Sequence, residues 1–355
     1  MLTIISFFLV LLVLVLVHEW GHFFAAKKTG MTVEEFGFGF PPRAASIVKN
    51  GTRYSFNWLP LGGFVKIQGE NGEDESPGSF STKSVPARFI VLAAGVIMNL
   101  VLAWVLLSAS LTFGTPQAVG LTNGDAAKNN LRVVVGAVAS GSPAEAAGFE
   151  SGDVIYKVNG EDIVSVKAFQ EKTLALAGNE VVYDVSRENG PETLKATPRQ
   201  NPPAGQGALG VQLAEVADVS YPWYQAIGKG LVLTWEYLKL TLSGFGQLIG
   251  GLFGGPGVSG EVAGPIGIAV LTGKFAKIGI VALMQFTALL SINLAVINAL
   301  PIPALDGGRI LFLLIEGIRG KKVRAKVEQW SHAIGFALLL ALMLLVTIAD
   351  VLKLF

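Results

Sequence analysis

The sequence predicts a polytopic α-helical membrane protein with about four transmembrane helices and one inserted globular domain. Three observations favour this fold class. The chain of 355 residues is 51% hydrophobic and only 15% charged, whereas soluble domains carry about 25% charged residues. Its mean hydropathy is +0.55, and the apolar residues are concentrated in a few long runs. Between about Thr115 and Glu215 the composition returns to that of a soluble domain.

Four runs are long and apolar enough to cross a bilayer, which takes about 20 helical residues. They are approximately Leu2–Ala26, Phe89–Phe113, Ile278–Ala299 and Ala333–Ile348. The first run has no basic segment in front of it and no small-residue cleavage site before His18. We therefore expect it to be a retained span rather than a cleaved signal peptide.

A fifth apolar run, Ile227–Ile249, is interrupted by Lys229, Glu236 and Lys239. Its apolar residues recur every three or four positions, which places them on one face of a helix. We expect an amphipathic helix that lies in the membrane interface. The Gly-rich stretch Gly250–Gly260 that follows is expected to be a flexible connection.

Basic residues in the loops predict the orientation of the spans. The loops after the first and third spans are rich in basic residues, namely Lys27, Lys28, Arg43, Lys49, Arg53, Lys66, Lys83, Arg88, Arg309, Arg319, Lys321, Lys322, Arg324 and Lys326. Such loops face the cytoplasm. Both termini and the segment from about Gly114 to Lys277 then face outward.

Composition also limits the kinds of ligand. The formal net charge is +1, which argues against a nucleic-acid partner because such proteins normally carry a basic excess. The chain has no cysteine, so any metal site must use His, Asp or Glu. Only three histidines occur, and two of them lie close together at the end of the first apolar run.

That run ends in His18-Glu19-Trp20-Gly21-His22, an HExxH motif. Residues four apart lie on one face of a helix, so the two imidazoles can bind one Zn²⁺. Glu19 lies beside them, where its carboxylate can act as the general base toward zinc-activated water. Two histidines and a glutamate at membrane depth cost several kcal/mol unless they have partners, which argues against a chance pattern.

A catalytic zinc usually has three protein ligands and one open position. Asp306 lies just after the third span, and the first and third spans run in the same direction. Asp306 is therefore expected at the depth of His18 and His22, although it is distant in sequence. His332 begins the fourth span on the same side and is an alternative third ligand.

Four segments, in order, resemble the site-2 protease family of intramembrane zinc metalloproteases in its bacterial single-PDZ form. They are the HEWGH motif, Leu61-Gly-Gly-Phe-Val-Lys66, Gly264-Pro-Ile-Gly-Ile268 and Asn298-Ala-Leu-Pro-Ile-Pro-Ala-Leu-Asp306-Gly-Gly308. The resemblance covers essentially the whole chain. Trp20 departs from the Leu or Phe that is usual at its position, which is not a ligand position.

The resemblance implies that zinc (Zn²⁺) is the cofactor. It makes His18, His22 and Asp306 the metal ligands and Glu19 the catalytic base. It also implies that Asn298 holds the substrate or the developing oxyanion, to which an amide can donate a hydrogen bond.

The segment Tyr54–Gly69 is expected, by the same resemblance, to form a membrane-associated β-hairpin that dips toward the active site. It contains Gly62 and Gly63, which we include among the substrate-binding residues. An exposed strand edge there could bind an unwound substrate by strand addition. Unwinding is needed because a transmembrane helix keeps its peptide groups in internal hydrogen bonds.

The run from Gly141 to Gly160, which contains Ser-Pro-Ala-Glu-Ala-Ala-Gly-Phe-Glu-Ser-Gly-Asp-Val-Ile-Tyr-Lys-Val-Asn, resembles a PDZ domain of the bacterial protease type. Leu131–Val138 and Val181–Val185 have strand character, and Ser142–Gly148 has that of a short helix with a proline start. A PDZ domain can bind a peptide beside one of its strands. A folded spacer with an empty groove is the alternative.

Together these observations divide the chain into four parts. Residues 1–114 are the first half of the membrane protease core, and 115–215 are an extracytoplasmic PDZ domain. Residues 216–263 are an interfacial amphipathic helix with a Gly-rich linker, and 264–355 are the second half of the core. We expect a multi-pass protein of the bacterial inner membrane, with its active site near the cytoplasmic side.

The resemblance implies regulated intramembrane proteolysis of single-span membrane proteins, such as anti-sigma factors or remnant signal peptides. A non-catalytic PDZ membrane adaptor, or pseudoprotease, is the alternative, but such a protein would be free to lose Glu19 or a ligand. The complete motif therefore favours the enzyme. A metal transporter would need polar groups along several spans, and these are scarce.

Overall fold

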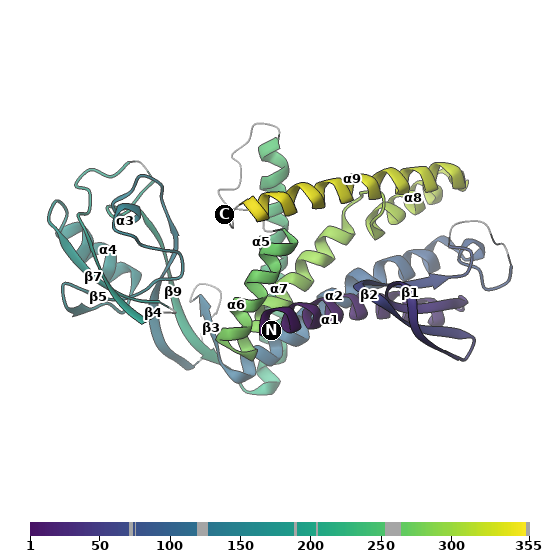
Figure 1. Cartoon of the computed structure of the whole chain (residues 1–355), viewed down its shortest axis with the longest axis horizontal. Helices are drawn as coiled ribbons and strands as arrows, with labels where there is room; N and C mark the ends of the chain where they lie inside the picture. The colour runs from purple at the N-terminus through teal and green to yellow at the C-terminus, as the bar shows by residue number, and fades with distance from the viewer. Residues whose placement is uncertain are drawn as a thin grey trace. The chain divides into compact units, whose positions relative to one another are not determined.

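The computed structural model describes most of the chain in two compact units. One unit comprises residues 1–110 and 227–355, and the other comprises residues 111–226 (Figure 1). The described residues are 1–70, 74, 76–118, 127–187, 190–203, 205–252 and 264–352. The Gly-rich linker expected at Gly250–Gly260 lies, from residue 253 on, outside the described residues.

Among the described residues, four helices are long and apolar enough to cross a membrane. They are α1 (Leu2–Lys28), α2 (Val85–Phe113), α7 (Ile280–Ala299) and α9 (Ala325–Leu352), with mean hydropathies between 2.2 and 2.6. This confirms the expectation of four spanning segments at the level of length and composition. Helix α7 is the most buried of the four, with 39% of its apolar window inside the protein, against 11% for α9. Helix α7 is therefore central, and α9 presents most of its apolar surface outward.

The expected amphipathic helix is α5 (Trp223–Leu252), which extends beyond the predicted run at both ends. Leu233 and Thr234 are buried, whereas Leu231 and Trp235 are more than half exposed. The helix lies against α2, because the indole N–H of Trp104 donates to the carbonyl of Ile227 at 2.8 Å. One side of α5 thus packs on protein and the other presents apolar side chains outward.

Two shorter helices, α6 (Pro265–Ile278) and α8 (Asp306–Arg319), also belong to this unit. Helix α6 packs against α1, α7 and α9. The buried Asp350 of α9 accepts hydrogen bonds from the backbone N–H groups of Gly264 (3.1 Å) and Gly267 (2.8 Å). This carboxylate satisfies backbone donors that a helix N-terminus leaves without partners.

A small sheet lies beside α1. Strands β1 (Val33–Lys49) and β2 (Thr52–Ile67) are antiparallel, and Glu35 is opposite both Arg53 and Lys66. The first part of β1 therefore pairs on one side with the beginning of β2 and on the other side with its end. The chain of β2 reverses direction between these two parts. The short 3₁₀ helix η1 (Phe80–Thr82) follows the sheet.

In the second unit the strands form one antiparallel sheet in the order β3-β9-β4-β5-β7-β8, and β6 pairs with β5. The strands are β3 (Thr115–Ala118), β4 (Ala127–Val138), β5 (Val154–Val158), β6 (Glu161–Asp162), β7 (Val181–Arg187), β8 (Gly190–Ala196) and β9 (Val211–Ser220). Helices α3 (Pro143–Ala146) and α4 (Val166–Ala175) are capped by Ser142 and Ser165, whose hydroxyls accept backbone N–H bonds.

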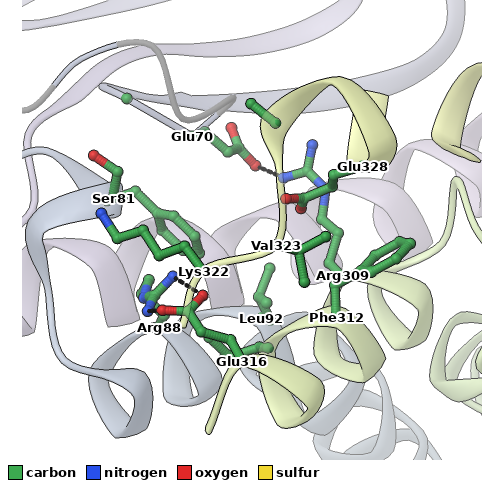
Figure 2. A pocket seen from close by; sticks show the side chains of 14 residues that line it. Glu70, Ser81, Arg88, Leu92, Arg309, Phe312, Glu316, Lys322, Val323 and Glu328 are labelled. Carbon is green, nitrogen blue, oxygen red and sulfur yellow. Dashed lines mark hydrogen bonds and ion pairs between the residues drawn. The ribbon is translucent and has the colours of Figure 1, made fainter. Parts of the chain in front are cut away.

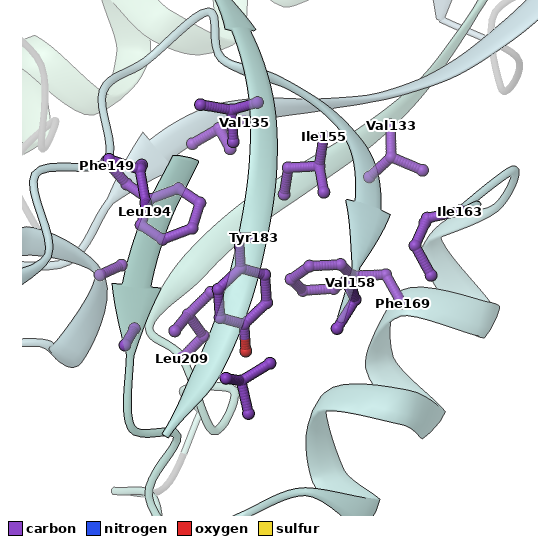
Figure 3. Packing of buried hydrophobic residues seen from close by; sticks show 14 residues of the cluster. Val133, Val135, Phe149, Ile155, Val158, Ile163, Phe169, Tyr183, Leu194 and Leu209 are labelled. Carbon is purple, nitrogen blue, oxygen red and sulfur yellow. The ribbon is translucent and has the colours of Figure 1, made fainter. Parts of the chain in front are cut away.

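The core of this unit is built around Tyr183, which is fully buried. Its ring centroid lies 5.4 Å from that of Phe149 and 5.9 Å from that of Phe169 (Figure 3). Ile155 and Val158 of β5 contribute to the same cluster. Aromatic contacts of this kind add to the free energy of apolar burial.

The Ile155→Ala substitution tests this core. It removes a side chain that is 1% exposed, so we expect a loss of about 2–5 kcal/mol of unfolding free energy. The matched control is Tyr156→Ala, the next residue of β5, which is 36% exposed. Hydrogen exchange of the β5 and β7 amides in the full chain measures the effect. Equal protection in both variants would contradict this account of the core.

Candidate metal centre

The two histidines of the HExxH motif lie near the C-terminal end of α1. Both are buried, and their Nε2 atoms are 3.2 Å apart. Their rings meet edge to face with centroids 4.8 Å apart. The helical spacing of four residues therefore brings His18 and His22 onto one face, as the motif predicts.

Asp306 joins them from α8. Its Oδ2 atom lies 3.2 Å from Nε2 of His18 and 3.4 Å from Nε2 of His22. The residue begins α8 and so belongs to a helix rather than to a turn. A Cβ atom at Gly307 would lie 2.2 Å from the carbonyl oxygen of Leu300. The glycine after Asp306 is thus required for the helix to start so close to the preceding loop.

The donor set fits a zinc ion. Two imidazole nitrogens and one carboxylate oxygen lie within 4.8 Å of one another. Oδ2 of Asp306 is buried and has no hydrogen-bond partner among the described residues. The two Nε2 atoms face each other, so at least one of them must present a lone pair rather than an N–H group. A cation among the three atoms would satisfy all of them, and this is the ligand set of many catalytic zinc sites.

The outer nitrogens of both imidazoles meet partners on α2. Nδ1 of His22 lies 2.8 Å from the backbone carbonyl of Val91. Nδ1 of His18 lies 3.1 Å from the side-chain amide of Asn99, which is fully buried. Sequence reasoning did not single out Asn99. Its one signal is that it is the single side-chain amide in the uncharged run Phe89–Phe113.

Gly95, also on α2, leaves the room that the imidazoles occupy. A Cβ atom at this position would lie 2.3 Å from Nε2 of His22 and 2.8 Å from Cε1 of His18. Real Cβ atoms do not approach other atoms this closely. The close passage of α1 and α2 at the candidate centre therefore depends on glycine here.

The structure brings the other expected site residues to the same place. A cavity of about 280 Å³ is lined by His18, Asp306 and all four remaining candidates: Glu19, Gly62, Gly63 and Asn298. A Cβ atom at Gly63 would lie 3.2 Å from Cγ of Glu19, so the backbone of β2 passes close to this carboxylate. A reacting group in this cavity would be next to His18 and Asp306 of the candidate metal centre. The carboxylate of Glu19, the amide of Asn298 and the backbone of β2 would also surround it.

His332, the alternative third ligand, has another partner. Its Nδ1 atom accepts a hydrogen bond from the backbone N–H of Ala304 at 2.7 Å. Ala304 has a φ of 82°, a conformation that non-glycine residues rarely adopt. His332 thus contacts the loop that leads into Asp306, whereas the group of three potential metal ligands consists of His18, His22 and Asp306.

Ion pairs fasten α8 to the first half of the chain (Figure 2). Arg309 pairs with Glu70, and Arg88 makes a bidentate pair with Glu316 at 2.5 and 3.0 Å. Burial alone would lower the pKa of the Arg309 guanidinium, but the Glu70 carboxylate raises it, so Arg309 stays charged. Both pairs line a polar cavity of about 230 Å³. They hold the helix that carries Asp306.

Known proteins resemble this chain over nearly its whole length. A family model described as peptidase family M50 matches residues 6–342. A protein of Clostridium perfringens is 36% identical, with 95% of each chain covered. The regulator of sigma-W protease RasP of Bacillus subtilis is 31% identical, with 99% of each chain covered.

Among solved structures, the PDZ domain of an SdrC-like protein of Listeria monocytogenes resembles part of the chain. It is 22% identical, and the match covers 23% of this chain and 85% of that one. The TM-score is 0.21, a value that does not establish a shared fold.

The Gly95→Ala substitution tests the candidate centre. The added methyl group would overlap the His22 ring, so we expect zinc affinity to fall about tenfold or more. Zinc content after dialysis against a chelator measures this. The matched control is Gly244→Ala in α5, where a Cβ atom meets nothing within 4 Å. Equal zinc retention by the two variants would show that the imidazoles do not need this space.

Proposed function

The chain belongs to peptidase family M50, the family of site-2 proteases, and from this premise we propose that it hydrolyses single-span membrane proteins within or beside the bilayer. It is a membrane protein and a metalloprotease of this family. The observation that carries the proposal is the position of Glu19. This carboxylate shares one cavity with His18 and Asp306, near the end of an apolar helix long enough to cross a membrane.

We assign His18, His22 and Asp306 as the ligands of the catalytic zinc. When bound, zinc supplies a Lewis acid that polarises a carbonyl group and lowers the pKa of water to about 7. Glu19 lies one residue from His18, and its role is to accept a proton from the attacking water and return it to the leaving amine. Water and the peptide bond are thereby converted into a carboxyl group and an amine, and no further reactant is needed.

We assign to Asn298 a role at the carbonyl oxygen of the scissile peptide group. It is half-buried and lines the same cavity as Glu19. An amide N–H can donate to the carbonyl oxygen as negative charge develops there, and a donor of this kind contributes about 3–4 kcal/mol in other hydrolases. Asn298 would thus stabilise the transition state rather than move protons.

The substrate must be extended before it can be cut, because a helix encloses its peptide bonds in i→i−4 hydrogen bonds. Residues Gly63–Ile67 of β2 pair with β1 on one side only, and no third strand pairs with them in the described part of the chain. Strand addition to this edge would place an extended substrate beside Glu19. A side chain at Gly63 would obstruct that approach.

The name of a relative and the basic loops support a substrate class and an orientation. The Bacillus subtilis relative is named as a regulator of sigma-W, which supports an anti-sigma factor as a substrate; remnant signal peptides are the other class. The basic loops after α1 and α7 support a cytoplasmic location of the active site. The chain would then be a multi-pass protein of the bacterial inner membrane, with α5 and the tip of the β1–β2 hairpin at the lipid interface.

We also propose that the 115–215 segment is an extracytoplasmic PDZ domain that binds a peptide. A mainly apolar groove of about 240 Å³ lies between α4 and β9, lined by Phe169, Leu174 and Leu213 among others. Among the described residues, Val211–Glu215 of β9 pair with β4 on one side only, and a strand edge beside an apolar groove is suited to an extended peptide. The domain could then restrict cleavage to membrane proteins that an earlier protease has already shortened.

The Glu19→Gln variant tests the mechanism. The amide cannot accept the proton, so cleavage of a model transmembrane substrate in proteoliposomes should fall by about 10²–10⁴-fold. Zinc content should stay at the parental level, because Glu19 is not a ligand. The Asp306→Ala variant should lose both zinc and activity. Parental turnover by Glu19→Gln would refute the assignment of the base.

A second variant tests the groove. Leu174→Asp places a charge in the apolar groove and should weaken binding of peptides selected from a displayed library by about tenfold, or about 1.4 kcal/mol. Val164→Asp is the matched control, because both side chains are 61% exposed and Val164 does not line the groove. Equal affinities, or no peptide selected by the parent protein, would mean that the groove is not a peptide site.

A further inference from the structure

We propose that Asn99 is a positioning residue of the zinc centre: its side-chain oxygen accepts the Nδ1–H of His18 and thereby aims Nε2 at the metal. This inference rests on the zinc site assigned above. It concerns a residue on α2, outside the HExxH motif and outside the segment around Asp306. Asn99 touches a ligand and not the substrate.

A neutral imidazole carries one N–H and one lone pair, and the hydrogen bond on one nitrogen decides which nitrogen can bind a metal. For His22 the choice is fixed. A backbone carbonyl can only accept, so Val91 requires Nδ1 of His22 to carry the hydrogen. The lone pair of Nε2 then points toward Oδ2 of Asp306, 3.4 Å away.

His18 needs an equivalent partner. Its Nε2 atom lies 3.2 Å from Oδ2 of Asp306, so its Nδ1 must also carry the hydrogen when Nε2 binds a metal. The group 3.1 Å from Nδ1 is the side-chain amide of Asn99. Among the described residues His18 has no carbonyl partner of the kind that Val91 gives to His22.

The amide of Asn99 can meet His18 with either end. With Nδ2 toward His18, two N–H groups would oppose each other at a metal-bound histidine. Oδ1 would also remain buried without a partner, as it does in this structure. A half-turn of the amide, whose two ends have nearly the same shape, brings Oδ1 to Nδ1. Oδ1 then gains a partner and the two opposed N–H groups are removed, while Nδ2 moves to the buried position that Oδ1 occupies here. Only this orientation is compatible with a ligand nitrogen at Nε2.

The position of Asn99 on α2 matches the spacing of the histidines on α1. Val91, Gly95 and Asn99 follow one another at intervals of four residues and so share a face of α2. The first supplies the acceptor for His22, the second leaves room for both rings, and the third meets His18. One stripe of α2 thus serves both imidazoles.

The backbone around Asn99 is also anchored. The hydroxyl of Ser291 on α7 donates to the carbonyl of Asn99 at 2.7 Å, and both residues are fully buried. A buried amide inside an apolar span is costly unless it serves a purpose. Outer hydrogen-bond partners of metal-bound histidines typically contribute 10–100-fold to metal affinity, a sufficient reason to keep Asn99 there.

The test measures zinc affinity of the purified full chain by competition with a chelator. Asn99→Leu removes the acceptor and should weaken zinc binding about 10–100-fold. Asn99→Asp keeps an acceptor and has no donor, so it should bind zinc within about threefold of the parent protein. Ser291→Ala, which loses a bond to the same helix without touching the amide, should also bind like the parent.

The comparison separates this inference from the function on which it rests. If Asn99→Leu binds zinc as tightly as the parent while His18→Ala does not, the role of Asn99 is wrong and the zinc site stands. If Asn99→Asp binds as weakly as Asn99→Leu, the amide is needed as a donor or for packing, and the proposal fails. If His18→Ala retains zinc, the site itself has been misassigned.

Discussion

The approach of a carboxylate on α8 to two imidazoles on α1 is the contact on which the rest of the structure depends. Three polar groups in an apolar helical bundle are expensive unless they satisfy one another or share a cation. His18 and His22 lie on one helix and Asp306 lies far from them in the chain, so their meeting constrains many other elements. Helix α8 must begin against the loop after α7, and α2 must pass close to α1.

Small residues and fixed hydrogen bonds meet these constraints. Gly307 lets α8 start beside the preceding loop, and Gly95 leaves space for the rings. His332 supports the strained backbone at Ala304, and the Arg309–Glu70 pair holds the helix on its other side. These contacts hold the elements that carry His18, His22 and Asp306 against one another. No further described strand pairs with the Gly63–Ile67 edge of β2, which suits the extended substrate that we propose.

The sequence revealed those features that leave a periodic or compositional signal. The four spanning helices and the amphipathic α5 follow from apolar runs and helical spacing, and the strand runs at Leu131–Val138 and Val181–Val185 fall within β4 and β7. Glu19 was identified from the HExxH motif, and Asn298, Gly62 and Gly63 were identified by resemblance; all four line one cavity.

Other features could not be predicted, for physical reasons. Helices α6 and α8 are only 14 residues long and rich in glycine at their starts, so local propensity does not mark them. The double pairing of β1 depends on tertiary contacts. The acceptor for His22 is the backbone carbonyl of Val91, which no side-chain pattern encodes. The role of Asn99 could not be predicted because the partner of its amide, His18, lies on another helix.

A crystal structure of the zinc-loaded protein, with anomalous scattering recorded at the zinc edge, tests the central claim most directly. We predict a single strong peak within about 2.0–2.2 Å of Nε2 of His18, Nε2 of His22 and a carboxylate oxygen of Asp306. A peak elsewhere, or Asp306 turned away from a zinc ion held by the two histidines alone, would contradict the account.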